Sequence, residues 1–102
     1  MGVLYLYTFF VKRKEVTMTD ASDTRVALIG IIVEDRSAVE AINNLLSEYG
    51  SYIIGRMGVP YAEKNISIIS IILDASNDVI SALSGKLGAL HGVSTKTIYS
   101  KK

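Results

Sequence analysis

The hydrophobic positions from Arg25 onward divide the chain into six segments with two different periodicities. Two runs, 26–33 (VALIGIIV) and 66–73 (ISIISIIL), are rich in β-branched residues and are apolar at both odd and even positions. This pattern predicts strands that are buried on both faces of a sheet. Segments 51–59 and 93–100 mix apolar residues with glycine, threonine and charged residues, and they predict strands at the sheet edges.

Two of the six segments repeat apolar residues at helical spacing. The first begins at Asp35 or Ser37, because either side chain can cap a helix and Ser37 has the capping-box spacing to Glu40. The second begins at Ser76 or Asn77, and glycines are expected to end both helices at 50 and 92. Their apolar stripes are Val39, Ile42, Leu45, Leu46 and Tyr49, and Val79, Ile80, Leu83, Leu87 and Leu90.

The order strand, helix, strand, strand, helix, strand predicts an α+β fold, the ferredoxin-like βαββαβ sandwich. Its antiparallel four-stranded sheet carries both helices on one face. The two central strands are nevertheless apolar on both faces, and exposed apolar patches of that size are rare on monomers. We therefore expect the open sheet face to be buried in a homo-oligomer, a dimer or a tetramer.

Residues 1–24 differ in composition from this domain, which is assigned to 25–102. An apolar run, 3–11, is followed by a basic triplet, 12–14, and then by polar residues. The run is far short of the ~20 residues that a membrane span needs. Because Met18 lies just before the regular pattern, residues 1–17 are interpreted as an upstream extension outside the native protein, with an added strand as the alternative.

The composition of the 102 residues disfavours several classes of function. Eleven Lys and Arg against ten Asp and Glu leave a net charge of +1, which disfavours autonomous nucleic-acid binding. The absence of cysteine and the single histidine, His91, supply too few ligands for a transition metal, so neither metal nor cofactor is expected. His91 is interpreted as a partner of a helix C-terminal dipole, and 34–36 (EDR) as a helix cap rather than a cation or effector site. The prediction is a protein that is not an enzyme.

The second helix has an unusual surface, which supplies the candidate binding site. Ser81, Ser84, Gly85 and Gly88 stand where a solvated helix usually carries charges, and each glycine costs roughly 1 kcal/mol relative to alanine. Close approach of a backbone or ligand would explain these small residues, whereas a weak helix with an unwound last turn is the alternative. The predicted ligand- or partner-binding residues are Ser84, Gly85, Lys86 and Gly88, with Arg56 as a weaker candidate.

The segment from about Arg25 to Lys101 resembles a known family, the ACT-like iron-only hydrogenase system regulators. The residues that carry the resemblance are Gly58-Val59-Pro60, Glu63-Lys64-Asn65, Asn77-Asp78, 82–88 (ALSGKLG), Gly92-Val93 and Lys96-Thr97. The resemblance implies an oligomeric, cytoplasmic regulatory domain associated with the maturation of iron-only hydrogenases. It also implies similarity to the C-terminal effector domain of nickel-responsive repressors.

Three differences from these proteins limit the properties that the resemblance implies for this chain. The metal-binding His and Cys of the nickel repressors have no counterparts here, and residues 1–24 are too short for their ribbon-helix-helix DNA domain. The glycine-containing turn with which many ACT domains bind amino acids is also missing after the first strand. The resulting hypothesis is a non-enzymatic regulator or sensor that acts through a small effector or a hydrogenase-system protein. A structural interaction subunit without ligand sensing is the alternative.

Overall fold

A computed structural model describes residues 8–11 and 23–102. After a short strand β1 (Thr8–Val11), the main elements are β2 (Arg25–Val33), α1 (Val39–Glu48), β3 (Ile53–Tyr61), β4 (Ile66–Ala75), α2 (Asn77–Gly88) and β5 (Val93–Tyr99). Short 3-10 helices lie in three connections: η2 (Arg36–Ala38), η3 (Gly50–Tyr52) and η4 (Ala62–Lys64).

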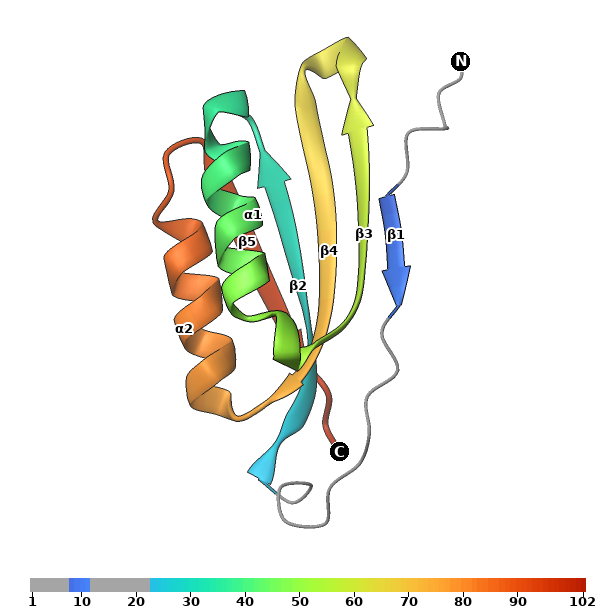
Figure 1. Ribbon diagram of the computed structural model, residues 1–102, viewed down its shortest axis with the longest axis vertical. Helices are drawn as coiled ribbons and strands as arrows, with labels where there is room; N and C mark the ends of the chain where they lie inside the picture. The colour runs from blue at the N-terminus through green and yellow to red at the C-terminus, as the bar shows by residue number, and fades with distance from the viewer. Residues whose placement is uncertain (1–7, 12–22) are drawn as a thin grey trace.

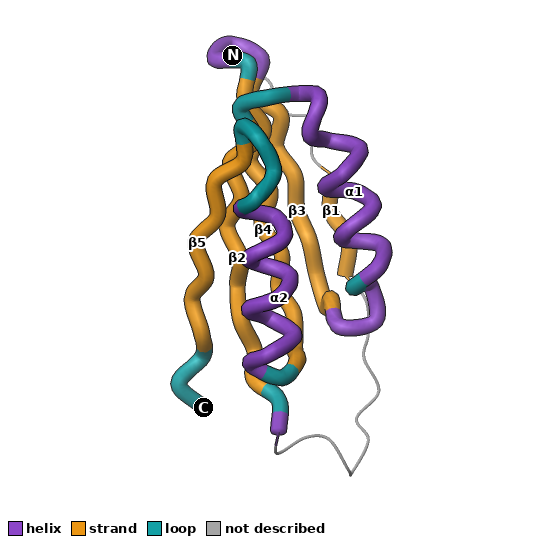
Figure 2. Tube along the Cα trace, turned by 90° about the vertical axis from the view of Figure 1, so that its left-hand side faces the viewer, coloured by secondary structure: helices purple, strands orange, loops and turns teal. Residues whose placement is uncertain are grey.

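The strands form one antiparallel sheet in the order β1-β3-β4-β2-β5, and both helices lie on the same side of it (Figures 1 and 2). Without β1, this is the ferredoxin-like arrangement predicted from the sequence, with β2 and β4 at the centre. Strand β1 pairs with β3 from Thr8 opposite Gly58 to Val11 opposite Gly55. The added-strand alternative therefore describes 8–11, whereas 1–7 and 12–22 lie outside the described residues.

The core lies between the sheet and the two helices. Alternate residues of β2 and β4 point into it, because successive side chains of a strand face opposite sides. The fully buried large side chains are Ile29, Ile31, Ile42, Ile71, Leu73, Ile80, Leu83 and Leu87. Except for Val39, which is exposed, the predicted stripes of both helices thus supply the helical half of the core, and the predicted central strands supply the other half.

The structure corrects several predicted boundaries. Strand β3 begins at Ile53 and runs through Pro60, which was expected in the turn but lies opposite Ser67. The 3-10 turn η3 occupies the residues before it. Helix α2 ends at Gly88 rather than continuing to Gly92, and the latter still takes the predicted positive φ, 75°.

The helix starts follow one of the predicted alternatives at each end. The Ser76 hydroxyl accepts a hydrogen bond from the Val79 amide at 3.3 Å and caps α2. Before α1, Asp35 rather than Ser37 is the capping residue, because its carboxylate accepts from the Ser37 amide. This bond opens η2, which leads into α1. Helix α1 itself begins at Val39 after Ala38, which makes no side-chain capping bond, so the capping box predicted for Ser37 and Glu40 is not formed.

The open sheet face carries most of the exposed large hydrophobic residues of the described chain. Of eight large hydrophobic residues that are exposed, seven lie on this face by the strand register, and Val39 of α1 is the eighth. The seven are Val26, Ile32, Met57, Tyr61, Ile68, Ile72 and Ile98. Within the described ranges, no helix is long and apolar enough to cross a membrane.

Candidate functional site

The small side chains of α2 lie against the edge strand β5. The Thr97 hydroxyl donates a hydrogen bond to the Ser84 hydroxyl at 3.0 Å. A Cβ added to Gly88 would lie 3.2 Å from the Thr95 hydroxyl oxygen, a close contact. The close approach that these small residues predicted is therefore present, and the neighbouring element is a strand of the same chain.

Gly85 and Lys86 lie elsewhere on the helix surface. A Cβ added to Gly85 would meet no atom within 4 Å, so this position is open. The Lys86 ammonium lies 3.9 Å from a Glu48 carboxylate oxygen and 5.2 Å from the centre of the Tyr49 ring. Its pKa is raised, first by the interaction with the Tyr49 side chain and then by the negative charge of Glu48. Lys86 thus links α2 to the end of α1.

Arg56 lies on β3, opposite Ile71, on the sheet face that carries the helices. Strand β3 is three positions from β5 in the sheet, a separation of roughly 14 Å at the usual strand spacing. The Arg56 Nε is buried without a hydrogen-bond partner among the described residues. The structure therefore does not join the five predicted binding residues into one site.

Asp35 is the centre of a polar cluster that connects two loops. Its Oδ1 accepts hydrogen bonds from the Ser37 amide at 2.9 Å and the Ser37 hydroxyl at 2.7 Å, and its Oδ2 lies 3.1 Å from His91 Nδ1. The Ser37 bonds, helped by His91, lower the pKa of Asp35 from 3.8 to about 2. Next to it, the Glu34 amide donates to the Gly92 carbonyl at 2.7 Å.

This cluster does not have the geometry of a catalytic triad. A triad needs a histidine between the hydroxyl nucleophile and the carboxylate, so that the imidazole removes the hydroxyl proton. Here the carboxylate of Asp35 lies between Ser37 and His91, and the His91 side chain is 93% exposed. The cluster acts as a cap and a loop clamp, which agrees with the capping interpretation of 34–36.

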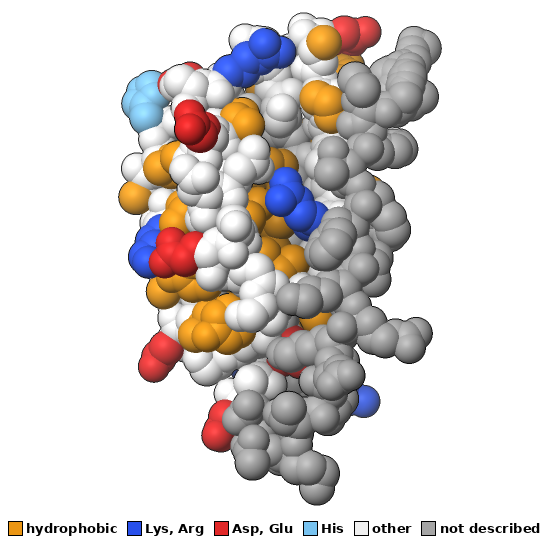
Figure 3. Space-filling view, in the orientation of Figure 1, with side chains coloured by type: hydrophobic (Ala, Val, Ile, Leu, Met, Phe, Trp, Pro, Cys, Tyr) orange, Lys and Arg blue, Asp and Glu red, His pale blue; other side chains and the backbone are white. Residues whose placement is uncertain are grey.

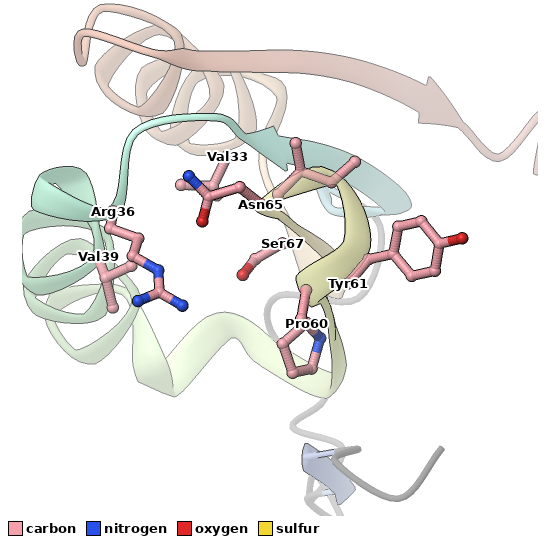
Figure 4. Close-up of a pocket in the computed structure, with 9 residues that line it drawn as sticks. Val33, Arg36, Val39, Pro60, Tyr61, Asn65 and Ser67 are labelled. Atoms are coloured by element: carbon pink, nitrogen blue, oxygen red, sulfur yellow. The ribbon is translucent and has the colours of Figure 1, made fainter. Parts of the chain in front are cut away.

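A cavity of about 170 Å³ opens at the end of the sheet where α1 begins and the β3–β4 connection turns (Figure 4). The side chains of Arg36, Asn65 and Ser67 supply its polar lining, and Figure 4 shows them directed toward the space between them. The ring of Tyr61 points away from this space. The remaining lining residues are Val33, Val39, Pro60, Ala62 and Ile66.

Sequence reasoning did not identify this cavity. Arg36 was considered as part of 34–36, where a helix cap was preferred to a cation or effector site, and Asn65 only among the residues that carry the family resemblance. One signal was available: asparagine tolerates the left-handed conformation, and Asn65 takes it with a φ of 55°. That signal marks a tight turn, but it does not say which side chains of α1 the turn will meet.

Metal-binding and strongly charged surfaces do not stand out in the described part of the chain. Residues 8–11 and 23–102 contain no group of three or more His, Cys, Asp and Glu side chains that could hold a metal ion. Figure 3 shows acidic and basic side chains interspersed on the helix-bearing side rather than gathered into a patch of one sign. The candidate chemistry is therefore that of a small-molecule cavity and an apolar sheet face.

Comparison with known proteins identifies the family to which this chain belongs. Residues 25–97 match the TM1266-like family, described as "Iron-only hydrogenase system regulator, putative". The chain belongs to this family. A solved structure of the uncharacterized protein TM1266 from Thermotoga maritima is similar to it, with a TM-score of 0.74 and 39% sequence identity over 76% of this chain and 99% of that chain. No curated protein matches the sequence.

Proposed function

We propose that this protein is a cytoplasmic, non-enzymatic regulatory subunit of an iron-only hydrogenase system and that it works as a homo-oligomer. Its copies meet through the open sheet face, as a dimer or a tetramer. Membership of the regulator family supports the regulatory role. The arrangement of Ser37, Asp35 and His91 supports a role without catalysis, because the Ser37 hydroxyl bonds to the Asp35 carboxylate rather than to the imidazole.

The observation that carries the proposal is the concentration of exposed apolar side chains on the open face. The residues Ile32 and Ile72 are 42% and 37% exposed there, and Ile98 at the β5 edge is 67% exposed. Burial of apolar area contributes roughly 25 cal/mol per Å², so a second copy over this face would stabilise both. A face that meets a copy of itself about a two-fold axis needs no other partner.

The test introduces charge into that face and measures the oligomeric state. We expect Ile32→Glu combined with Ile72→Glu to convert the oligomer into a folded monomer, because two carboxylates would have to be desolvated in the interface. The matched control is Val39→Glu, since Val39 is 39% exposed but lies on α1 rather than on the open face. Sedimentation velocity reports the assembly, and circular dichroism reports the fold. A monomeric unmodified protein at micromolar concentration would contradict the proposal.

A structural interaction subunit without ligand sensing is the alternative, and one observation favours it. Ser84 and Gly88, which were predicted to receive an effector or partner, are used within the chain for packing on β5. Both functions require the same oligomer. The two functions differ in whether a small molecule binds the folded protein. Binding at the cavity beside α1 can be tested directly.

A further inference from the structure

We propose that the cavity between the start of α1 and the β3–β4 turn binds a small aliphatic carboxylate, with Arg36 as its charge partner. The proposal extends the regulatory function by assigning a chemical class to the effector, and in that respect it rests on the proposed function. Binding itself is a property of the cavity and can be measured whether or not the chain regulates a hydrogenase.

The polar groups of the cavity are available to a ligand. The side chains of Arg36, Asn65 and Ser67 form no hydrogen bond or ion pair with one another or with any other described residue. They approach the space from separate elements, since Arg36 belongs to η2, Asn65 to the turn and Ser67 to β4 (Figure 4). A guanidinium presents a planar fork of donors that matches the two oxygens of a carboxylate.

The charge of the lining selects an anion. Arg36 is the one charged residue among those that line the cavity. Two acidic residues nearby have other partners: Asp35 accepts a hydrogen bond from the Ser37 hydroxyl, and the Glu63 carboxylate accepts one from the Tyr61 hydroxyl at 2.7 Å. Among the described residues, no carboxylate forms an ion pair with the Arg36 guanidinium.

The apolar lining and the volume select an organic acid with a short hydrocarbon chain. Val33, Val39 and Pro60 form walls that an inorganic anion would leave without apolar contacts. A cavity of about 150 Å³ holds a molecule the size of benzene, so a volume of about 170 Å³ suits an acid of about four to six carbons. Pentanoate has this size, and pentanamide has nearly the same shape without the charge.

The experiment is a titration of the full-length protein with pentanoate, followed by the backbone amide signals in nuclear magnetic resonance spectra. We expect saturable shifts centred on Arg36, Asn65 and Ser67. Arg36→Gln should weaken binding at least about tenfold, the loss expected for a charge-assisted hydrogen bond. The control is Lys64→Gln, because Lys64 is a neighbouring cation of η4 that does not line the cavity. This variant should bind pentanoate with unchanged affinity.

Several results would overturn the assignment. If the amide signals of the cavity residues show no saturable shifts, this carboxylate site is excluded. It is also excluded if Arg36→Gln binds pentanoate as tightly as the unmodified protein does. Pentanamide binding as tightly as pentanoate would show that charge is not recognised, and inorganic phosphate binding as tightly would show that the apolar walls are not used. Sedimentation velocity on the same samples separates the two proposals, since an oligomer that fails to bind pentanoate contradicts only the effector class.

Discussion

At the scale of single residues, Asp35 connects two loops that are far apart in the sequence. It caps the start of η2 and holds His91, which is 56 positions away in the sequence. Gly92 is required beside it for two reasons, since its φ is 75° and an added Cβ would overlap the Asp35 side chain and lie 3.1 Å from the Asp35 amide nitrogen. The two loops can approach each other only because residue 92 has no side chain.

This arrangement predicts an acid-dependent loss of stability. The pKa of Asp35 is about 2 in the folded protein and 3.8 ordinarily, so the unfolded chain binds the proton more tightly than the folded one. The stabilisation is therefore fully present above about pH 4 and is lost as the pH falls through about 2. We expect Asp35→Asn to flatten the decline of the urea midpoint between these values, because an amide does not titrate but still caps a helix.

His91→Ala is the companion variant in that measurement. Its effect on the acid range should be smaller than that of Asp35→Asn, because hydrogen bonds from Ser37 rather than from His91 are the largest causes of the lowered pKa. A decline in Asp35→Asn as steep as in the unmodified protein would show that another carboxylate controls the acid response.

Residue-level chemistry was the least predictable part of the molecule. The capping role of Asp35 could be read from its place before a helix, since capping depends on neighbours in the sequence. The cavity could not, because Arg36 meets Asn65 and Ser67 only after two strands and a helix have packed together. Local patterns carry no information about which turn lies opposite which helix end.

At the scale of elements, α2 shows what a pattern of small residues can and cannot indicate. The missing charges at Ser84 and Gly88 correctly predicted that another part of a protein lies close to this side of the helix. Within the chain the neighbour is β5, through Thr95 and Thr97, and binding of an effector or partner at this surface stays a prediction. Small residues indicate that another group approaches the helix closely. They do not tell whether that group is a strand of the same chain or an external ligand, because both need the same space.

The three glycines near the end of α2 should respond differently to alanine. Gly85→Ala is expected to stabilise the protein by up to about 1 kcal/mol, because it improves helix propensity and the new methyl group meets nothing within 4 Å. Gly88→Ala should gain less, since its methyl group lies 3.2 Å from the Thr95 hydroxyl. Gly92→Ala should cost at least about 2 kcal/mol through backbone strain and overlap with Asp35.

Urea denaturation of the three variants, with the unmodified protein alongside, measures this order. Gly85→Ala serves as the control, because it makes the same substitution on the same helix where there is room for it. Equal effects of Gly88→Ala and Gly92→Ala would contradict the close contact of the Gly92 loop with Asp35. A loss in Gly85→Ala would indicate that something covers that open position in solution.

At the scale of the whole molecule, the prediction of the fold succeeded because each step depended on periodicity. The doubly apolar strands could only be central, and two amphipathic helices could cover only one face of their sheet. The exposed residues of that other face, such as Ile32 and Ile72, are the expected remainder. Oligomerisation stays a prediction, because one chain shows the apolar face but not what covers it.

The segment before Arg25 is a separate question at this scale. The family match begins at residue 25, and the similar Thermotoga maritima protein corresponds over 99% of its length to 76% of this chain. The ferredoxin-like core of β2 to β5 with both helices is thus the part that this chain shares with its relatives. Strand β1 lies outside the matched range and adds four residues to the edge of β3.

We therefore predict that a chain beginning at Met18 keeps the fold and the oligomer. Its melting temperature should change by no more than about 5 °C. Each hydrogen bond between β1 and β3 contributes only about 1 kcal/mol net, and the conformational entropy that β1 loses on pairing offsets part of this gain. The open face, which we propose as the interface, retains Ile32, Ile68 and Ile72 in this shorter chain. Calorimetry and sedimentation velocity on both chains measure stability and assembly together. Aggregation or loss of the cooperative transition would instead show that β1 is needed to cover the backbone edge of β3, which would otherwise be free to pair with other chains.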